Sequence, residues 1–88
     1  MEEVLFETER VQSRGEIADL LRTVADRLDE GEPLSLSSGN DSVTVDVPSQ
    51  AEFEVKVERE RESGSSELSV EFELEWDENG GDDGLNVA

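Results

Sequence analysis

Ten residues near the C-terminal end alternate strictly between apolar and polar, mostly acidic, side chains. They run Glu67-Leu68-Ser69-Val70-Glu71-Phe72-Glu73-Leu74-Glu75-Trp76. A period of two places the apolar side chains on one face of a strand and the glutamates on the other. The stretch therefore predicts a β-strand with one face against a core, and it ends at the single tryptophan of the chain.

The rest of the chain predicts four more strands and one helix. The strands are expected at residues 4–11, 34–37, 42–47, 52–58 and 67–76. Turn-forming residues at 38–41 join two of them as a hairpin, and residues 59–66 are expected to be a polar loop. The alternation in 52–58 matches that of 67–76 and places Phe53, Val55 and Val57 inward.

The helix is predicted over residues 14–30. The Ser13 hydroxyl can accept a hydrogen bond from the amide of Glu16, and the Glu16 carboxylate can accept one from the amide of Ser13, which is a capping box. Apolar residues then recur every three or four positions from Ile17 to Leu28, so they form one stripe. Gly31 predicts a left-handed end to the helix.

This order, β-α-β-β-β-β, predicts an α+β fold of two layers. One helix packs on one face of a mainly antiparallel sheet. The residues expected to face inward are Val4, Phe6, Ile17, Leu20, Leu21, Val24, Leu28, Leu34, Leu36, Val43, Val45, Val47, Phe53, Val55, Val57, Leu68, Val70, Phe72, Leu74 and Trp76. Residues 1–76 are expected to form a single domain, followed by a disordered, acidic, glycine-rich tail at 77–88.

The charge balance predicts a protein that is adapted to concentrated salt. The chain holds 25 acidic residues against 7 basic ones, a net charge of −18. At ~1 M salt the Debye length is about 3 Å, so neighbouring carboxylates barely repel one another, whereas in dilute buffer they strain the compact state. Such a composition is typical of a cytoplasmic protein of a salt-accumulating archaeon. No export signal and no membrane-length apolar run is visible, which also predicts a soluble cytoplasmic protein.

The residue types that are missing limit the chemistry. The chain has no cysteine and no histidine, so it lacks thiolate ligands and the commonest general base. Its many carboxylates have no accompanying nucleophile or cofactor motif. The sequence therefore predicts a protein that is not an enzyme, with no catalytic residue, no metal site and no cofactor.

Three stretches together resemble the amphi-Trp domain family, small proteins of halophilic archaea. They are Val4–Glu9, the helix segment Arg14–Asp26, and the pair of alternating segments Phe53–Glu58 and Leu68–Trp76. The resemblance covers residues 4–76 and leaves 77–88 outside. It implies the fold and the habitat. The family has no assigned reaction, so no site residue carries over from it.

An apolar contact surface is the first functional hypothesis. One helix is too short to cover so much sheet, so a second copy or a protein partner is expected to cover the remainder. Phe72, Leu74 and Trp76 are the candidate contact residues, because tryptophan is enriched in binding hot spots. The competing interpretation is that Trp76 only closes one end of a small core.

An acidic surface is the alternative hypothesis. Glu71, Glu73 and Glu75 lie in a row and could mimic the phosphates of DNA or bind divalent cations through oxygen ligands. A solvated face adapted to salt explains the same glutamates, because parallel side chains on a flat sheet do not converge on an ion. Direct nucleic-acid binding is not expected, since an acidic surface repels phosphates.

Overall fold

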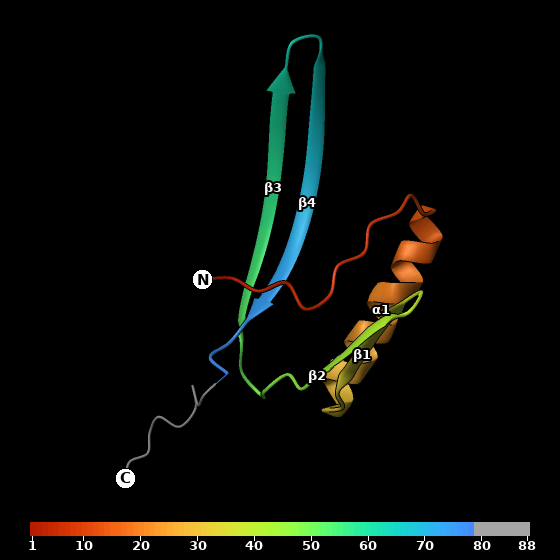
Figure 1. The fold of residues 1–88 in the computed structure, drawn as a ribbon, viewed down its shortest axis with the longest axis vertical. Helices are drawn as coiled ribbons and strands as arrows, with labels where there is room; N and C mark the ends of the chain where they lie inside the picture. Colours follow the sequence, from red (N-terminus) through yellow and green to blue (C-terminus); the bar gives the residue numbers. More distant parts are fainter. Residues whose placement is uncertain (79–88) are drawn as a thin grey trace. The chain divides into compact units, whose positions relative to one another are not determined.

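The computed structural model describes residues 1–78 and contains one helix and four strands within them (Figure 1). In chain order these are α1 (Arg14–Glu30), β1 (Leu34–Ser38), β2 (Asp41–Val45), β3 (Glu52–Glu62) and β4 (Ser65–Glu75). The strands pair antiparallel as two separate sheets, β1–β2 and β3–β4. The α+β class is therefore confirmed. The chain divides into two compact units, Met1–Ser49 and a second unit that starts at Gln50.

The predicted helix and both of its ends are confirmed. The amide of Glu16 donates to Ser13 Oγ at 3.1 Å, and the amide of Ser13 donates to Glu16 Oε1 at 3.1 Å. At the other end Gly31 has a φ of 72°, a left-handed conformation that is costly for residues with a Cβ. The amide of Glu32 closes the end by donating to the Arg27 carbonyl at 3.0 Å.

The first hairpin follows the prediction except at its outer end. β1 pairs with β2 from Leu34–Val45 to Ser38–Asp41, and α1 contacts β1. The predicted strand to Val47 is wrong, because β2 ends at Val45. Its partner β1 begins at Leu34, directly after Pro33, which has no N–H to extend the ladder.

The predicted strand at 4–11 is also wrong. Residues 1–13 join neither sheet, although the Thr8 and Ser38 hydroxyl oxygens lie 3.2 Å apart in a hydrogen bond. A strand needs a partner in a defined register, and register is set by a consistent apolar face. Here Leu5 is apolar on the side opposite to Val4 and Phe6, so the pattern does not select one face.

The second hairpin is longer than predicted. Every residue of β3 pairs with β4, from Glu52–Glu75 to Glu62–Ser65. The predicted polar loop at 59–66 is wrong, because the turn is confined to Ser63 and Gly64, with Gly64 at a φ of 81°. Arg59-Glu60-Arg61-Glu62 continues the period of two through alternating charge instead of alternating polarity. We call the paired strands β3 and β4 the ribbon.

The predicted core is not found among the described residues of either unit. No side chain among residues 1–78 is fully buried. The half-buried members of the predicted inward set are Phe6, Val24, Leu34, Val43, Val45, Val47, Leu74 and Trp76. Two strands form one layer, and a layer buries its apolar face only against another. The predicted packing of one helix on a single sheet stays a prediction, and residues 79–88 of the predicted tail lie outside the described residues.

Candidate interaction surface

The pairing of β3 with β4 sorts their side chains onto two faces, because successive residues of a strand point to opposite sides. We define the apolar face by Phe53, Val55, Val57, Leu68, Val70, Phe72 and Leu74. We define the acidic face by Glu52, Glu54, Lys56, Glu58, Glu60, Glu62, Glu67, Glu71, Glu73 and Glu75. Every glutamate of the two strands lies on the acidic face. The ribbon is therefore amphipathic from the Phe53–Leu74 pair to Leu68.

Within residues 50–78 of its own unit, nothing covers the apolar face. Six of its seven residues are between 55% and 67% exposed, and only Leu74 is half-buried. Phe53 and Phe72 stack diagonally across the strands, with ring centroids 6.3 Å apart and ring planes 8° from parallel. Aromatic pairs at this separation attract each other. The stack orders the two rings and leaves their outer surfaces free for contact with another apolar group.

The three predicted contact residues lie at one end of this face. Leu74 pairs with Phe53, and Phe72 pairs with Val55. Trp76 follows one residue after the end of β4, at the position where the alternation continues the apolar face, and it is half-buried. The structure therefore brings Phe72 and Leu74 together on one surface with Phe53 and Val55, which were expected to be core.

Two arginines on the same side of the ribbon were missed by the sequence reasoning. Arg59 pairs with Leu68 and Arg61 pairs with Ser66, so both continue the apolar face toward the Ser63–Gly64 turn. We call them the arginine end. The sign of the charge was the available signal, because within residues 59–62 each arginine falls on an apolar-face position and each glutamate on an acidic-face position.

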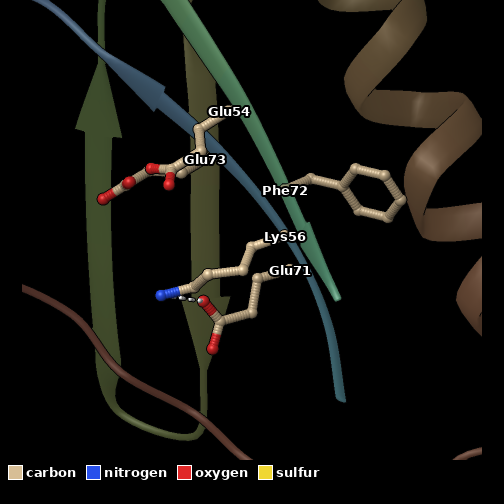
Figure 2. A pocket seen from close by; sticks show the side chains of 5 residues that line it. All are labelled: Glu54, Lys56, Glu71, Phe72 and Glu73. Carbon is tan, nitrogen blue, oxygen red and sulfur yellow. Dashed lines mark ion pairs between the residues drawn. The ribbon is translucent and has the colours of Figure 1, made fainter. Parts of the chain in front are cut away.

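The acidic face places like charges directly opposite each other. Three cross-strand pairs consist of two glutamates: Glu52–Glu75, Glu54–Glu73 and Glu60–Glu67. Directly opposed like charges destabilise a sheet. One pair is complementary, since Lys56 Nζ lies 4.0 Å from Glu71 Oε1. Figure 2 shows four of these charged side chains, Glu54, Lys56, Glu71 and Glu73, on one side of the strands and Phe72 on the other.

The crowding of carboxylates changes the titration of Glu73. Its pKa is raised above the usual value, first by a side-chain hydrogen bond with Glu54 and then by the negative charges of Glu54 and Glu75. A hydrogen bond between two carboxyl groups requires a proton on one of them. The pair is thus a place where the folded ribbon holds a proton more tightly than an isolated glutamate does.

The acidic face does not gather its carboxylates around a point. Glu54, Lys56, Glu71 and Glu73 line an open depression of about 380 Å³ together with Phe72 (Figure 2). Lys56 brings a positive charge into it. Among residues 1–78 no group of three or more acidic side chains is arranged to hold a metal ion. The geometry therefore gives no support to the divalent-cation form of the acidic-surface hypothesis.

A second depression lies in the first unit, between its N-terminal segment, α1 and β1. It measures about 480 Å³, and its apolar lining residues are Phe6, Leu20 and Leu36. Its polar lining is mainly of hydroxyl side chains, which include Thr8 and Ser38. Since the chain has no histidine or cysteine, these hydroxyls have no imidazole to activate them for nucleophilic chemistry.

Comparison with known proteins gives one family. The model of the Amphi-Trp domain family matches residues 1–88. The match includes residues 77–88, so the expectation that these residues lie outside the family pattern is wrong. No curated protein and no solved structure matches the chain. No helix among residues 1–78 has the length and apolar character needed to cross a membrane.

Proposed function

The chain belongs to the Amphi-Trp domain family, and from its two surfaces we propose that it is a non-enzymatic interaction domain adapted to high salt. It binds a protein partner or a second copy of itself through the apolar face and Trp76. The observation that carries this proposal is the exposure of the apolar face, where six residues are more than half exposed.

The energetic argument starts from the marginal stability of a lone hairpin. A two-stranded ribbon without a covering layer is marginally stable at best in water. Burying apolar surface contributes roughly 25 cal/mol per Å². Stable monomeric proteins rarely leave a contiguous patch of this kind open, and such patches commonly mark interaction sites. A covering partner therefore stabilises the ribbon while it binds.

The proposal of salt adaptation is supported by the crowded carboxylates of the acidic face. Three glutamate pairs face each other across the strands, and Lys56 is the single lysine of the chain. Exposed charges are screened strongly at ~1 M salt, where the Debye length is about 3 Å. Concentrated salt also strengthens apolar association when its ions are excluded from the protein surface. Both faces of the ribbon thus favour the same solvent, which supports a place in a salt-rich cytoplasm.

The proposal of a non-enzymatic role rests on side-chain chemistry. The two depressions are open and are lined by carboxylates, hydroxyls and apolar groups. The chain has no imidazole to serve as a general base and no thiol to serve as a nucleophile. Recognition through an apolar face requires none of these groups.

Charge reversal separates this proposal from the acidic-surface alternative. The native domain is immobilised in high KCl and compared with Trp76→Ala and with a variant that carries Glu→Lys at Glu71, Glu73 and Glu75. Loss of a hot-spot tryptophan weakens binding by ~2 kcal/mol or more, about thirtyfold. We expect Trp76→Ala to reduce the amount of partner protein that the immobilised domain retains, and the charge reversal to leave that amount largely unchanged. The opposite pattern would favour the acidic surface.

A further inference from the structure

We infer that the occupant of the apolar face is a second copy of this chain, packed face to face and turned end for end. This inference rests on the proposed function, because it names the partner of the same surface. The paired copy places its arginine end over Trp76 and Phe53 of the first copy, and the contact is repeated by symmetry at the other end.

The area of the apolar face fits a partner of its own size. Aromatic side chains bury ~150–250 Å² each, and six apolar residues that are more than half exposed offer on the order of 600 Å². A standard protein–protein interface buries about 800 Å² on each partner. The aliphatic stems of Arg59 and Arg61, which lie on the same side of the ribbon, add to the apolar area. A second copy of this face therefore supplies a surface of the required extent.

The two ends of the face differ in chemistry. From the open end to the turn, the paired residues are Phe53–Leu74, Val55–Phe72, Val57–Val70, Arg59–Leu68 and Arg61–Ser66. Aromatic side chains gather at the open end, where Trp76 follows β4, and positive charge gathers at the other. Guanidinium groups attract the faces of aromatic rings, most strongly those of tryptophan. The arginine end is therefore complementary to the aromatic end, whereas two arginine ends repel each other.

This polarity selects one of the two face-to-face arrangements. An isologous dimer repeats each contact about a two-fold axis. If the axis runs along the strands, Arg61 lies over Ser66 of the second copy and Arg59 over Leu68. The arginine ends of both copies then share one end of the contact, and their like charges repel. If the axis runs across the strands at the level of Lys56 and Glu71, Arg59 lies over Phe53, and Arg61 reaches the level of Trp76, which continues the neighbouring strand. In the middle, the Val57–Val70 pair of one copy then lies over Val55 and Phe72 of the other.

The acidic face supports the same arrangement. It carries every glutamate of β3 and β4, so each copy turns its carboxylates outward to solvent and brings none of these groups into the contact. A partner with a basic surface would be drawn to the acidic face instead. The apolar face, whose only charges are two arginines, is matched by an apolar surface with exposed aromatic rings at one end. The chain itself has such a surface.

Spin labels at the hairpin turn test the orientation, since the chain has no native cysteine. Ser63→Cys is labelled and studied by pulsed dipolar spectroscopy in high KCl. Ser63 is seven residues from Lys56, so at ~3.4 Å per residue the two turns of an end-for-end dimer lie about 50 Å apart. A parallel dimer, with sheets ~10 Å apart, brings the labels within about 25 Å. Dilution with unlabelled protein must remove the signal, which shows that it arises between copies.

Two substitutions test the arginine contact by sedimentation. We expect Arg61→Ala to raise the dimer dissociation constant about tenfold, because two symmetric contacts are lost, each worth a few-fold. Arg22→Ala is the matched control. It removes an exposed arginine of α1 that pairs with Asp19 at 2.8 Å, and it should leave the dissociation constant unchanged.

Three results would overturn the inference. One is a label distance below about 25 Å, and another is an Arg61→Ala variant that associates as tightly as the native chain. The third is a chain that stays monomeric at high concentration, as it would if its own helix covered the face. In that third case the proposed function still stands if another protein is retained in a Trp76-dependent way, and it fails if none is.

Discussion

The two units of this chain differ in what stabilises them. The first unit has local devices, with a capping box at Ser13 and a left-handed end at Gly31, and its hairpin half-buries Leu34, Val43 and Val45. The second unit is a fully paired ribbon whose apolar residues are more than half exposed, apart from the half-buried Leu74. The comparison teaches that complete backbone pairing does not itself provide burial. The ribbon needs a covering surface, and that need is the basis of the proposed function.

The largest expected effect comes from placing a charge on the apolar face. Phe72→Asp should weaken association at least thirtyfold, which corresponds to ~2 kcal/mol, because it buries an unpaired carboxylate and removes the stack on Phe53. Sedimentation in high KCl measures the mass, and circular dichroism should show an unchanged helix. The neighbouring Glu73→Gln, on the opposite face, is the matched control. If the Phe72→Asp protein still associated as the native chain does, the apolar face of the ribbon would not be the contact surface.

A smaller effect is expected at Gly31 and Gly64, two of the glycines with positive φ. Gly64→Ala and Gly31→Ala should each cost about 1–2 kcal/mol, the usual cost of a left-handed residue with a Cβ. Neither added Cβ meets an atom within 4 Å, so the cost is conformational. Thermal unfolding followed by circular dichroism measures both. Gly64→Ala should also weaken association, whereas Gly31→Ala should not. Equal effects of the two on association would contradict the division into units.

The N-cap gives a third effect, confined to the first unit. Ser13→Ala should destabilise the helix by about 1 kcal/mol, since the amide of Glu16 loses its acceptor. Ser13→Asp restores a good N-cap and serves as the control. The helical circular-dichroism signal during thermal unfolding measures the change. Association through the apolar face should be the same in all three proteins, and a parallel loss of association would show that the ribbon depends on the helix.

The smallest effect is on pH dependence. The folded ribbon raises the pKa of Glu73, chiefly through its hydrogen bond with Glu54, so the folded state binds this proton more tightly than the unfolded state. The free energy of unfolding should therefore rise as the pH falls through the raised pKa, and the gain should be lost as the pH rises above it. Denaturation of the native protein at low KCl and several pH values measures how the free energy of unfolding changes with pH. Glu73→Gln should flatten this dependence, and an unchanged slope would contradict this assignment.

The parts of the fold that could be predicted from the sequence depend on local chemistry. Ser13, Glu16 and Gly31 act on their own neighbours, so the helix was predicted at both ends. The alternation at Phe53 and at Phe72 is local to each segment, so both strands were predicted from it, whereas their pairing as a ribbon was not. The turn at Gly64 was placed too broadly, because polar alternation was treated as a loop.

The parts that could not be predicted depend on partners distant in the sequence. The segment at 4–11 has strand-forming residues, but a strand exists only with a neighbour in register, and Leu5 weakens the choice of face. Burial was expected for Val55 and Val70 because one face is apolar, yet the alternation does not say what covers that face. Of the candidate site, Phe72, Leu74 and Trp76 were predicted. The position of Arg59 and Arg61 on the same side as the apolar face became visible only from the register of β3 with β4.

The fluorescence of Trp76 on dilution tests the central claim most directly, because it uses the native chain and its single tryptophan. Emission and sedimentation are recorded together in high KCl over a wide range of protein concentration. The account predicts blue emission in the associated protein and a shift to red over the same concentrations at which the mass falls to that of one chain. An emission maximum that stays constant while the mass changes, or a mass of one chain at every concentration, would contradict it.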